Sequence, residues 1–339
     1  MVRGRRTGGE GVAGHLYPAK STCNPKLETE WTAYPILHLS FARTRYNEAK
    51  NLDTLLNIQL TRWERIYGND PIEETFGARF DGIIHRAYEQ TGKRVVILID
   101  EYDSPMLDSN ANEALRQELR DTVREFFSPL KDDTNFIRFL FITGITKFSQ
   151  MSIFSELNSL DDISLWDEYS AICGITENEL LTQFKPDIEA LARKNDETYE
   201  EACTHLKHLY DGYHFSQRSE DIYNPFSLIN VLSKRMYGSY WYATGTPSFL
   251  VESLQARDIE IPYLEDCETI AASFDKSTDT LTDPLPVLYQ SGYLTIKSYK
   301  DGVYTLGFPN EEVRYGFIHS LLPSTTGQSV AESSISMEE

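Results

Sequence analysis

An uninterrupted apolar run that ends in two carboxylates is the feature that most constrains the fold of this chain. Residues 95–99 are Val-Val-Ile-Leu-Ile, and Asp100 and Glu101 follow them directly. A run of this kind, without alternating polar residues, is typical of a strand buried on both faces of a parallel sheet. Ligands of such sheets bind beyond the carboxyl ends of the strands. The sequence therefore predicts an α/β protein with a carboxylate site at that edge of the sheet.

The two carboxylates also have the pattern of a Walker B strand in a P-loop ATPase. In that pattern the aspartate holds Mg²⁺, and the glutamate after it orients or deprotonates the attacking water. For this chain the pattern assigns Asp100 to the metal and Glu101 to the water. Acidic residues at strand ends also cap helices or lie in solvent, so the plainer interpretation stays open.

The hydrophobic pattern in the first half of the chain predicts alternating strands and helices. Strands are expected at 36–41, 94–100 and 136–142, and helices at 51–67, 72–90 and 111–127. This order implies right-handed crossovers and a largely parallel sheet. We expect the 94–100 strand to lie between the other two, and each strand to be covered on both faces.

The second half of the chain has a different pattern. A short strand is expected at 170–175, after which Thr176 caps the first of several helices that continue to about Tyr210. Another helix is expected at 228–236. Near the C-terminus, Asp301-Gly302 separates two alternating runs, which is a strong hairpin signal. A helical piece before this hairpin suggests a small winged-helix-like unit.

Composition and charge narrow the class of protein. The formal net charge of −20 disfavours broad contact with a phosphate backbone. No run approaches the roughly 18 apolar residues that span a bilayer, so we expect no contact with a membrane. The four cysteines are widely spaced and form no Cys-x-x-Cys motif. This pattern indicates reduced thiols in a cytoplasmic protein.

A series of segments, all in register along the chain, carries a family resemblance. They are Glu30-Trp31-x-x-Tyr34-Pro35-Ile36-Leu37-His38-Leu39-Ser40-Phe41, Leu98-Ile99-Asp100-Glu101-Tyr102-Asp103-Ser104-Pro105, Thr143-Gly144-Ile145-Thr146-Lys147-Phe148-Ser149, Ser152-Ile153-Phe154-Ser155-x-Leu157-Asn158, Tyr210-Asp211-Gly212-Tyr213-x-Phe215, Tyr223-Asn224-Pro225-Phe226-Ser227 and Thr244-Gly245-Thr246-Pro247-x-Phe249-Leu250. From about Leu27 to Leu322 the chain resembles the AAA-ATPase-like proteins of gut and other anaerobic bacteria. The resemblance implies a P-loop NTPase-like parallel sheet with helices on both faces, and binding of ATP and Mg²⁺.

The chain departs from this family at both ends. Its members usually carry an Arg-Arg-Phe-Gly-Lys-Ser type phosphate loop and a C-terminal nuclease-like domain of the PD-(D/E)XK type. The nearest imitation of the loop here is residues 14–21, where Ala19 replaces the second glycine and Pro18 removes an amide donor. We interpret it as a chance match. The expectation is a truncated or degenerate member with weak ATP binding and weak or no hydrolysis.

These patterns divide the chain into expected regions. Residues 1–25 are unlike the family and are expected to be disordered, so that the sheet lacks a strand beside 136–142. The other expected regions are an ATPase-like core at 26–175, a helical region at 176–282, a winged-helix-like unit at 283–322 and a polar tail at 323–339.

Three more residues near the strand ends are candidates for the site. Thr143 resembles a sensor of the terminal phosphate, or it forms a strand-end turn with Gly144. Lys147 is either a phosphate ligand or a solvated loop charge. Asp103 is either a further magnesium ligand through water or a turn-initiating aspartate.

The sequence also supports a rival hypothesis. The rival is a non-catalytic module whose C-terminal region binds a protein or nucleic acid, with the partner unknown. His205 and His208 share a helix face and could bind a metal, but surface histidines are the preferred interpretation. Arg116, Arg120 and Arg124 also share a helix face, where interleaved acids favour ion pairs over a finger for a neighbouring subunit.

Overall fold

The computed structural model describes residues 32–109, 112–147, 160–241, 264–276 and 284–326, and the side chains up to residue 319. The expectations for residues 1–25, and for most of the tail at 323–339, concern residues outside these ranges. None of the described helices is both long and apolar enough to cross a bilayer.

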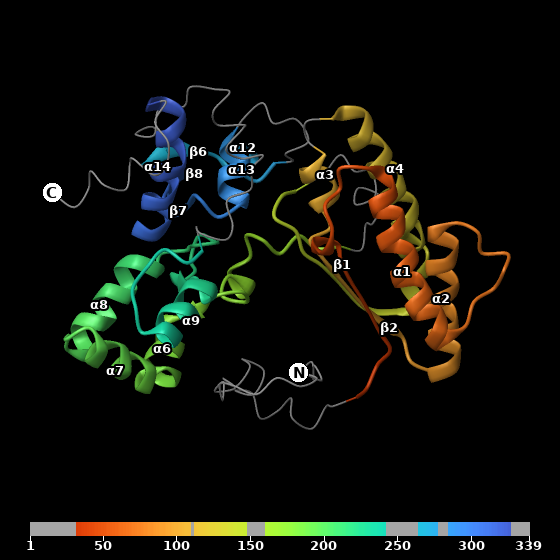
Figure 1. The fold of residues 1–339 in the computed structure, drawn as a ribbon, viewed down its shortest axis with the longest axis horizontal. Helices are drawn as coiled ribbons and strands as arrows, with labels where there is room; N and C mark the ends of the chain where they lie inside the picture. Colours follow the sequence, from red (N-terminus) through yellow and green to blue (C-terminus); the bar gives the residue numbers. More distant parts are fainter. Residues whose placement is uncertain (1–31, 110–111, 148–159, 242–263, 277–283, 327–339) are drawn as a thin grey trace.

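A three-stranded parallel sheet organises the first half of the chain (Figure 1). Its strands are β1 (Ile36–Ser40), β2 (Val95–Asp100) and β3 (Ile137–Ile142), in the order β1-β2-β3. Leu39 pairs with Ile99, which in turn pairs with Ile142. The predictions of one parallel sheet, and of the 94–100 strand at its centre, are confirmed.

Helices α1 (Ala49–Tyr67), α2 (Phe76–Thr91) and α4 (Glu113–Phe127) connect these strands, with a short α3 (Ser104–Asp108) after β2. The Thr75 side chain accepts a hydrogen bond from Ala78 N, so α2 begins at Phe76 and not near residue 72 as the pattern predicted. The helix ends as predicted at Gly92, whose left-handed φ of 63° suits glycine. Single 3₁₀ turns lie at Phe41–Arg43, Ser128–Lys131, Asp133–Asn135 and Asp167–Tyr169.

The helices of the first half lie on one face of the sheet (Figure 1). Leu37, Leu39, Ile97 and Ile99 point into a core that they share with α1, α2 and α4. On the opposite face, Phe139 is 53% exposed. The expectation of helices on both faces is therefore not met within the described residues. A continuous apolar run identifies a strand, but it does not identify what covers the second face.

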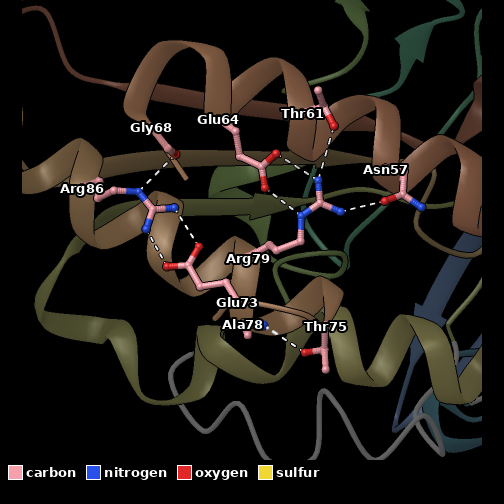
Figure 2. Close-up of polar contacts among 9 residues, drawn as sticks. All are labelled: Asn57, Thr61, Glu64, Gly68, Glu73, Thr75, Ala78, Arg79 and Arg86. Carbon is pink, nitrogen blue, oxygen red and sulfur yellow. Dashed lines mark hydrogen bonds and ion pairs between the residues drawn. The ribbon is translucent and has the colours of Figure 1, made fainter. Parts of the chain in front are cut away.

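Two arginines of α2 fasten this helix to α1 and to the loop between them (Figure 2). Arg79 donates to both carboxylate oxygens of Glu64, from Nε at 2.7 Å and from Nη2 at 3.0 Å. Arg86 donates to Glu73 and, from Nε at 3.1 Å, to the carbonyl oxygen of Gly68. Forked pairs of this kind fix the orientation of both side chains. They hold α1 and α2 in one orientation above the sheet.

A group of helices follows the sheet. Its members are α6 (Glu177–Gln183), α7 (Lys185–Lys194), α8 (Tyr199–Tyr210) and α9 (Pro225–Lys234), which share a core of their own. Thr176 and Thr198 cap α6 and α8 through complete capping boxes, as the sequence predicted for Thr176. The strand expected at 170–175 is only the two-residue β4 (Ile175–Thr176), paired antiparallel with β5 (Ile222–Tyr223).

The last described part is a small antiparallel sheet with three helices. It comprises β6 (Cys267–Thr269), α12 (Ala271–Phe274), α13 (Pro284–Gln290), β7 (Thr295–Lys300), β8 (Val303–Gly307) and α14 (Glu311–Thr326), with strand order β6-β8-β7. Asp301 and Gly302 both have positive φ, 51° and 88°, as the two-residue turn of a hairpin requires. The predicted hairpin is confirmed, and the winged-helix description stays a prediction.

Candidate functional site

The ends of all three parallel strands meet at Asp100. Thr143, directly after β3, donates a hydrogen bond from Oγ1 to Asp100 Oδ1 at 2.7 Å. Ser40, the last residue of β1, donates from Oγ to Asp100 Oδ2 at 3.3 Å. Neighbouring parallel strands end at the same edge, so this contact follows from the sheet itself. Asp100 therefore supplies the carboxylate that was expected at this edge of the sheet, and its contact with Thr143 joins two neighbouring strand ends.

The donor set at Asp100 suits a magnesium ion. One exposed carboxylate lies between two hydroxyl groups, and all three are hard oxygen donors of the kind that Mg²⁺ prefers. Magnesium is commonly held by one or two carboxylates together with phosphate oxygens and waters. The residues present therefore fit the ion that the Walker B pattern implies.

Glu101 lies where the chain leaves the sheet. Its φ of 56° is left-handed, which is uncommon for a residue with a side chain. The chain then returns to the neighbouring strand, because Tyr102 N donates to Thr143 O at 3.1 Å. Burial of the Glu101 carboxyl raises its pKa, and the negative charges of Asp103 and Asp100 raise it further. A carboxylate with a raised pKa accepts a proton more readily, as the role of a base requires.

Asp103 is buried against the loop that follows β3. It is fully buried, and Oδ2 accepts hydrogen bonds from Thr146 N at 2.6 Å and from Thr146 Oγ1 at 2.9 Å. A Cβ at Gly144 would lie 2.6 Å from Asp103 Oδ1, so glycine is required for this close approach. Asp103 therefore fastens the loop after β3 to α3. We leave it out of the magnesium site.

Lys147 links two parts of the described chain that are distant in sequence. Its Nζ forms ion pairs with Asp162, at 2.6 Å, and with Asp275. Its backbone N donates to Gln290 Oε1 at 2.7 Å. Lys147 thus links the loop after β3 to the helices beside the small antiparallel sheet. This arrangement differs from both sequence interpretations, a phosphate ligand and a solvated loop charge. Residues 14–21, considered as a phosphate loop, lie outside the described residues.

Sequence reasoning missed a second polar site, at the segment Tyr210-Asp211-Gly212-Tyr213. A cavity of about 670 Å³ opens there among α8, β7, β8 and the start of α14. Its charged lining includes Lys207, Asp211, Asp221, Lys297 and Arg314. The Tyr210 hydroxyl donates to Gly238 O at 2.9 Å, which fastens the end of α8. The sequence signal that could have identified this site is Asp211, an acidic residue in a segment that begins and ends with tyrosine.

Asp211 should make stability depend on pH. Burial raises its pKa from 3.8 to about 6, with a further contribution from Asp221 and an opposing one from Lys207. Between about pH 4 and pH 6 the folded state therefore holds a proton that the unfolded state has released, and stability falls as pH rises. We expect Asp211→Asn to stabilise the protein at pH 7.5 by about 1–3 kcal/mol and to have little effect at pH 4. Urea unfolding at both pH values measures this.

Asp221→Asn is the matched control, since His214 lowers the pKa of Asp221 through a hydrogen bond. A carboxyl group whose pKa is lowered by folding stabilises the protein at pH values above its pKa in the unfolded state. Asp221→Asn removes this contribution, so the variant should be less stable at pH 7.5. A stabilising effect of both variants would contradict the assignment to Asp211.

The two remaining residue groups have structural roles among the described residues. His205 pairs with Glu197 at 2.9 Å through Nδ1. Arg116 pairs with Glu113, and Arg124 lies 3.8 Å from Asp121, both within α4. These contacts agree with the preferred interpretations of surface histidines and of a salt-bridged helix.

Part of this chain is similar in sequence to a known protein family. Residues 20–154, which include the whole parallel sheet and the residues around Asp100, match the family model described as "Predicted AAA-ATPase". A protein of Azotobacter chroococcum mcd 1, described as "Uncharacterized protein in vnfD 5'region", is 36% identical over 301 residues, which are 86% of this chain and 55% of that protein. The chain thus spans about half the length of this relative. No solved structure matches. Residues 20–154 are therefore similar to the predicted AAA-ATPase family.

Proposed function

We propose that this chain is a nucleotide-binding module that holds Mg-ATP at the carboxyl edge of the parallel sheet. Asp100 holds the magnesium ion in the manner of a Walker B aspartate, Glu101 positions the attacking water, and Thr143 senses the terminal phosphate. The observation that supports this best is the 2.7 Å hydrogen bond from Thr143 to Asp100, which joins two neighbouring strand ends at that edge. Magnesium would neutralise phosphate charge.

The Thr143 hydroxyl can couple nucleotide to metal. A hydroxyl has one proton to donate, and here Thr143 donates it to Asp100. Donation to a phosphate oxygen would release that carboxylate oxygen, which then becomes a free ligand for the ion. Glu101 lies one residue further along, where its raised pKa suits it to accept a proton from water.

Binding is expected to be weak and hydrolysis slow or absent. Phosphoryl transfer depends mostly on positioning and charge neutralisation by amides and a lysine. Lys147, the cation that follows Thr143 in the described loop, is held by Asp162 and Asp275. In residues 14–21, Pro18 lacks an amide donor.

The dissociation constant for Mg-ATP should therefore lie above about 1 mM, or roughly −4 kcal/mol. Saturation-transfer NMR at millimolar Mg-ATP detects such weak binding, and calorimetry detects anything tighter. The signal should be lost in Asp100→Ala and kept in Asp121→Ala, which removes an exposed aspartate of α4. Equal signals from both variants and the parent chain would refute the assignment.

Two results of the calorimetry would revise the proposal. Micromolar binding that vanishes in Lys20→Ala would identify residues 14–21 as a working phosphate loop. Binding that survives Lys20→Ala but is lost in Asp100→Ala would indicate a phosphate site elsewhere.

The second candidate function is a non-catalytic interaction module. The cavity beside Asp211 supports it, because the buried Asp211 Oδ1 has no hydrogen-bond partner among the described residues. A partner bound there would be a protein more readily than a nucleic acid, given the net charge of −20. Such binding would be unaffected by Asp100→Ala and reduced by Asp211→Ala.

A further inference from the structure

A second group of potential metal ligands lies at the opposite edge of the parallel sheet. Asp81 and His85 are one turn apart on α2, and Asp133 belongs to the 3₁₀ turn just before β3. His85 Nε2 lies 3.0 Å from Asp133 Oδ1 and 3.8 Å from Asp81 Oδ1. One ligand atom from each residue lies within 4.8 Å of the other two. An imidazole nitrogen and two carboxylates therefore converge on one point.

The group is separate from the proposed nucleotide site. The His85 ring packs against Phe136, with ring centroids 4.1 Å apart. The carbonyl oxygen of Phe136 accepts the hydrogen bond of Val95 N, the first residue of β2. The three ligands thus lie at the amino ends of β2 and β3, whereas Asp100 and Thr143 lie at their carboxyl ends. A strand of this length, at about 3.3 Å per residue, separates the two places by roughly 20 Å.

Asp133 supplies the independent sign that a ligand is needed. The residue is only 5% exposed, and Oδ2 is buried without a hydrogen-bond partner among the described residues. A buried carboxylate oxygen with no donor is costly.

We propose that Asp81, His85 and Asp133 bind one divalent transition-metal ion, with Zn²⁺ bound more tightly than Mn²⁺. His85 contributes Nε2, and each aspartate contributes a carboxylate oxygen. The mixed nitrogen and oxygen set favours a first-row transition metal over Mg²⁺ or Ca²⁺, which prefer oxygen ligands only. The stated order of the two ions follows the general affinity order of these metals.

The geometry assigns a structural role to this ion. Two ligands belong to α2 and the third to the turn that leads into β3, so the ion would cross-link helix and sheet. Metal that binds only the folded state stabilises it by mass action. Three protein ligands leave coordination positions for water.

Calorimetric titration of the full chain, freed of metal with a chelator, tests the proposal with Zn²⁺, Mn²⁺ and Mg²⁺ in turn. We expect one equivalent of Zn²⁺ to bind, Mn²⁺ more weakly, and Mg²⁺ weakest of the three. His85→Gln and Asp133→Asn should each weaken Zn²⁺ binding at least tenfold and abolish the rise in melting temperature that Zn²⁺ produces. The control is His205→Gln, which removes a surface histidine paired with Glu197 and should change neither quantity.

A second measurement tests the proposal on the unmodified chain, so that it does not depend on whether a variant folds. Mn²⁺ broadens proton resonances close to it, so a histidine signal should disappear on addition of Mn²⁺ to the unmodified chain. That signal is assigned to His85 in the unmodified chain by its proton contacts with the ring of Phe136, whose centroid lies 4.1 Å from that of His85. Unchanged Zn²⁺ affinity in both ligand variants, or broadening confined to other histidines, would overturn the proposal and leave the group as an ion pair. Asp100→Ala should leave Zn²⁺ binding intact, so the test is independent of the nucleotide site.

Discussion

Replacing Gly212 with alanine is expected to lower the free energy of unfolding by about 2–5 kcal/mol. The residue has a φ of 92°, a conformation that an L side chain rarely adopts. A Cβ built there would also lie 2.2 Å from the carbonyl oxygen of Pro309, which is backbone and cannot rotate away. The substitution therefore combines backbone strain with a steric clash.

Gly212 joins two parts of the molecule, which makes the clash hard to relieve. Gly212 lies between the end of α8 and the β-bridge that pairs Tyr213 with Ile222. Pro309 lies shortly before the start of α14. The carbonyl oxygen of the neighbouring Asp211 accepts a hydrogen bond from Asn310 Nδ2 at 2.8 Å. Moving Pro309 would break this contact as well.

Chemical denaturation followed by tryptophan fluorescence measures the loss, and Gly92→Ala is the matched control. Gly92 also has a positive φ, 63°, but a Cβ there would meet no atom within 4 Å. The control should lose only the strain, about 1–2 kcal/mol. Equal losses in the two variants would show that the close approach to Pro309 does not limit the substitution.

The three strands and the strand-end contact could be predicted because they depend on local pattern and on the geometry of parallel sheets. The run at 95–99 is apolar enough to identify β2 without further information. Parallel neighbours end at one edge, so the approach of Thr143 to Asp100 followed from the strand order. Caps such as Thr176 and Gly92 act within a few residues and were equally accessible.

The directions of individual side chains could not be predicted in this way. Asp103 follows Asp100 closely in sequence, yet the left-handed backbone at Glu101 and the absence of a side chain at Gly144 allow it to lie buried against Thr146. Lys147 is paired with Asp275, 128 positions away. Such pairings depend on how distant segments pack, which hydrophobic periodicity does not specify.

The cluster at Asp133 illustrates the same limit. The spacing of Asp81 and His85 on one helix face was visible in the sequence. The third member lies 48 positions beyond His85 and approaches it only because β3 lies beside β2. A helical pair alone is too common to predict a metal site, so the cluster becomes visible only in the fold.

Truncation of Phe126 to alanine is expected to cost about 3–5 kcal/mol of unfolding free energy. Phe126 is 1% exposed and lies at the centre of an aromatic group on the helical side of the sheet. Its ring centroid is 4.7 Å from that of Phe80 and 5.2 Å from that of Phe127. These partners come from α2 and α4, so the cavity would open between two helices and could not close without moving one of them.

Phe139→Ala is the control, because it removes the same side chain from the other face of the sheet. Phe139 is 53% exposed and contacts Phe141 with ring centroids 6.1 Å apart. Its truncation should change the unfolding free energy by no more than about 0.5 kcal/mol. Urea unfolding of both variants under one set of conditions gives the comparison. A loss from Phe139→Ala that approached the loss from Phe126→Ala would mean that Phe139 is buried in solution, and that the sheet is covered on both faces after all.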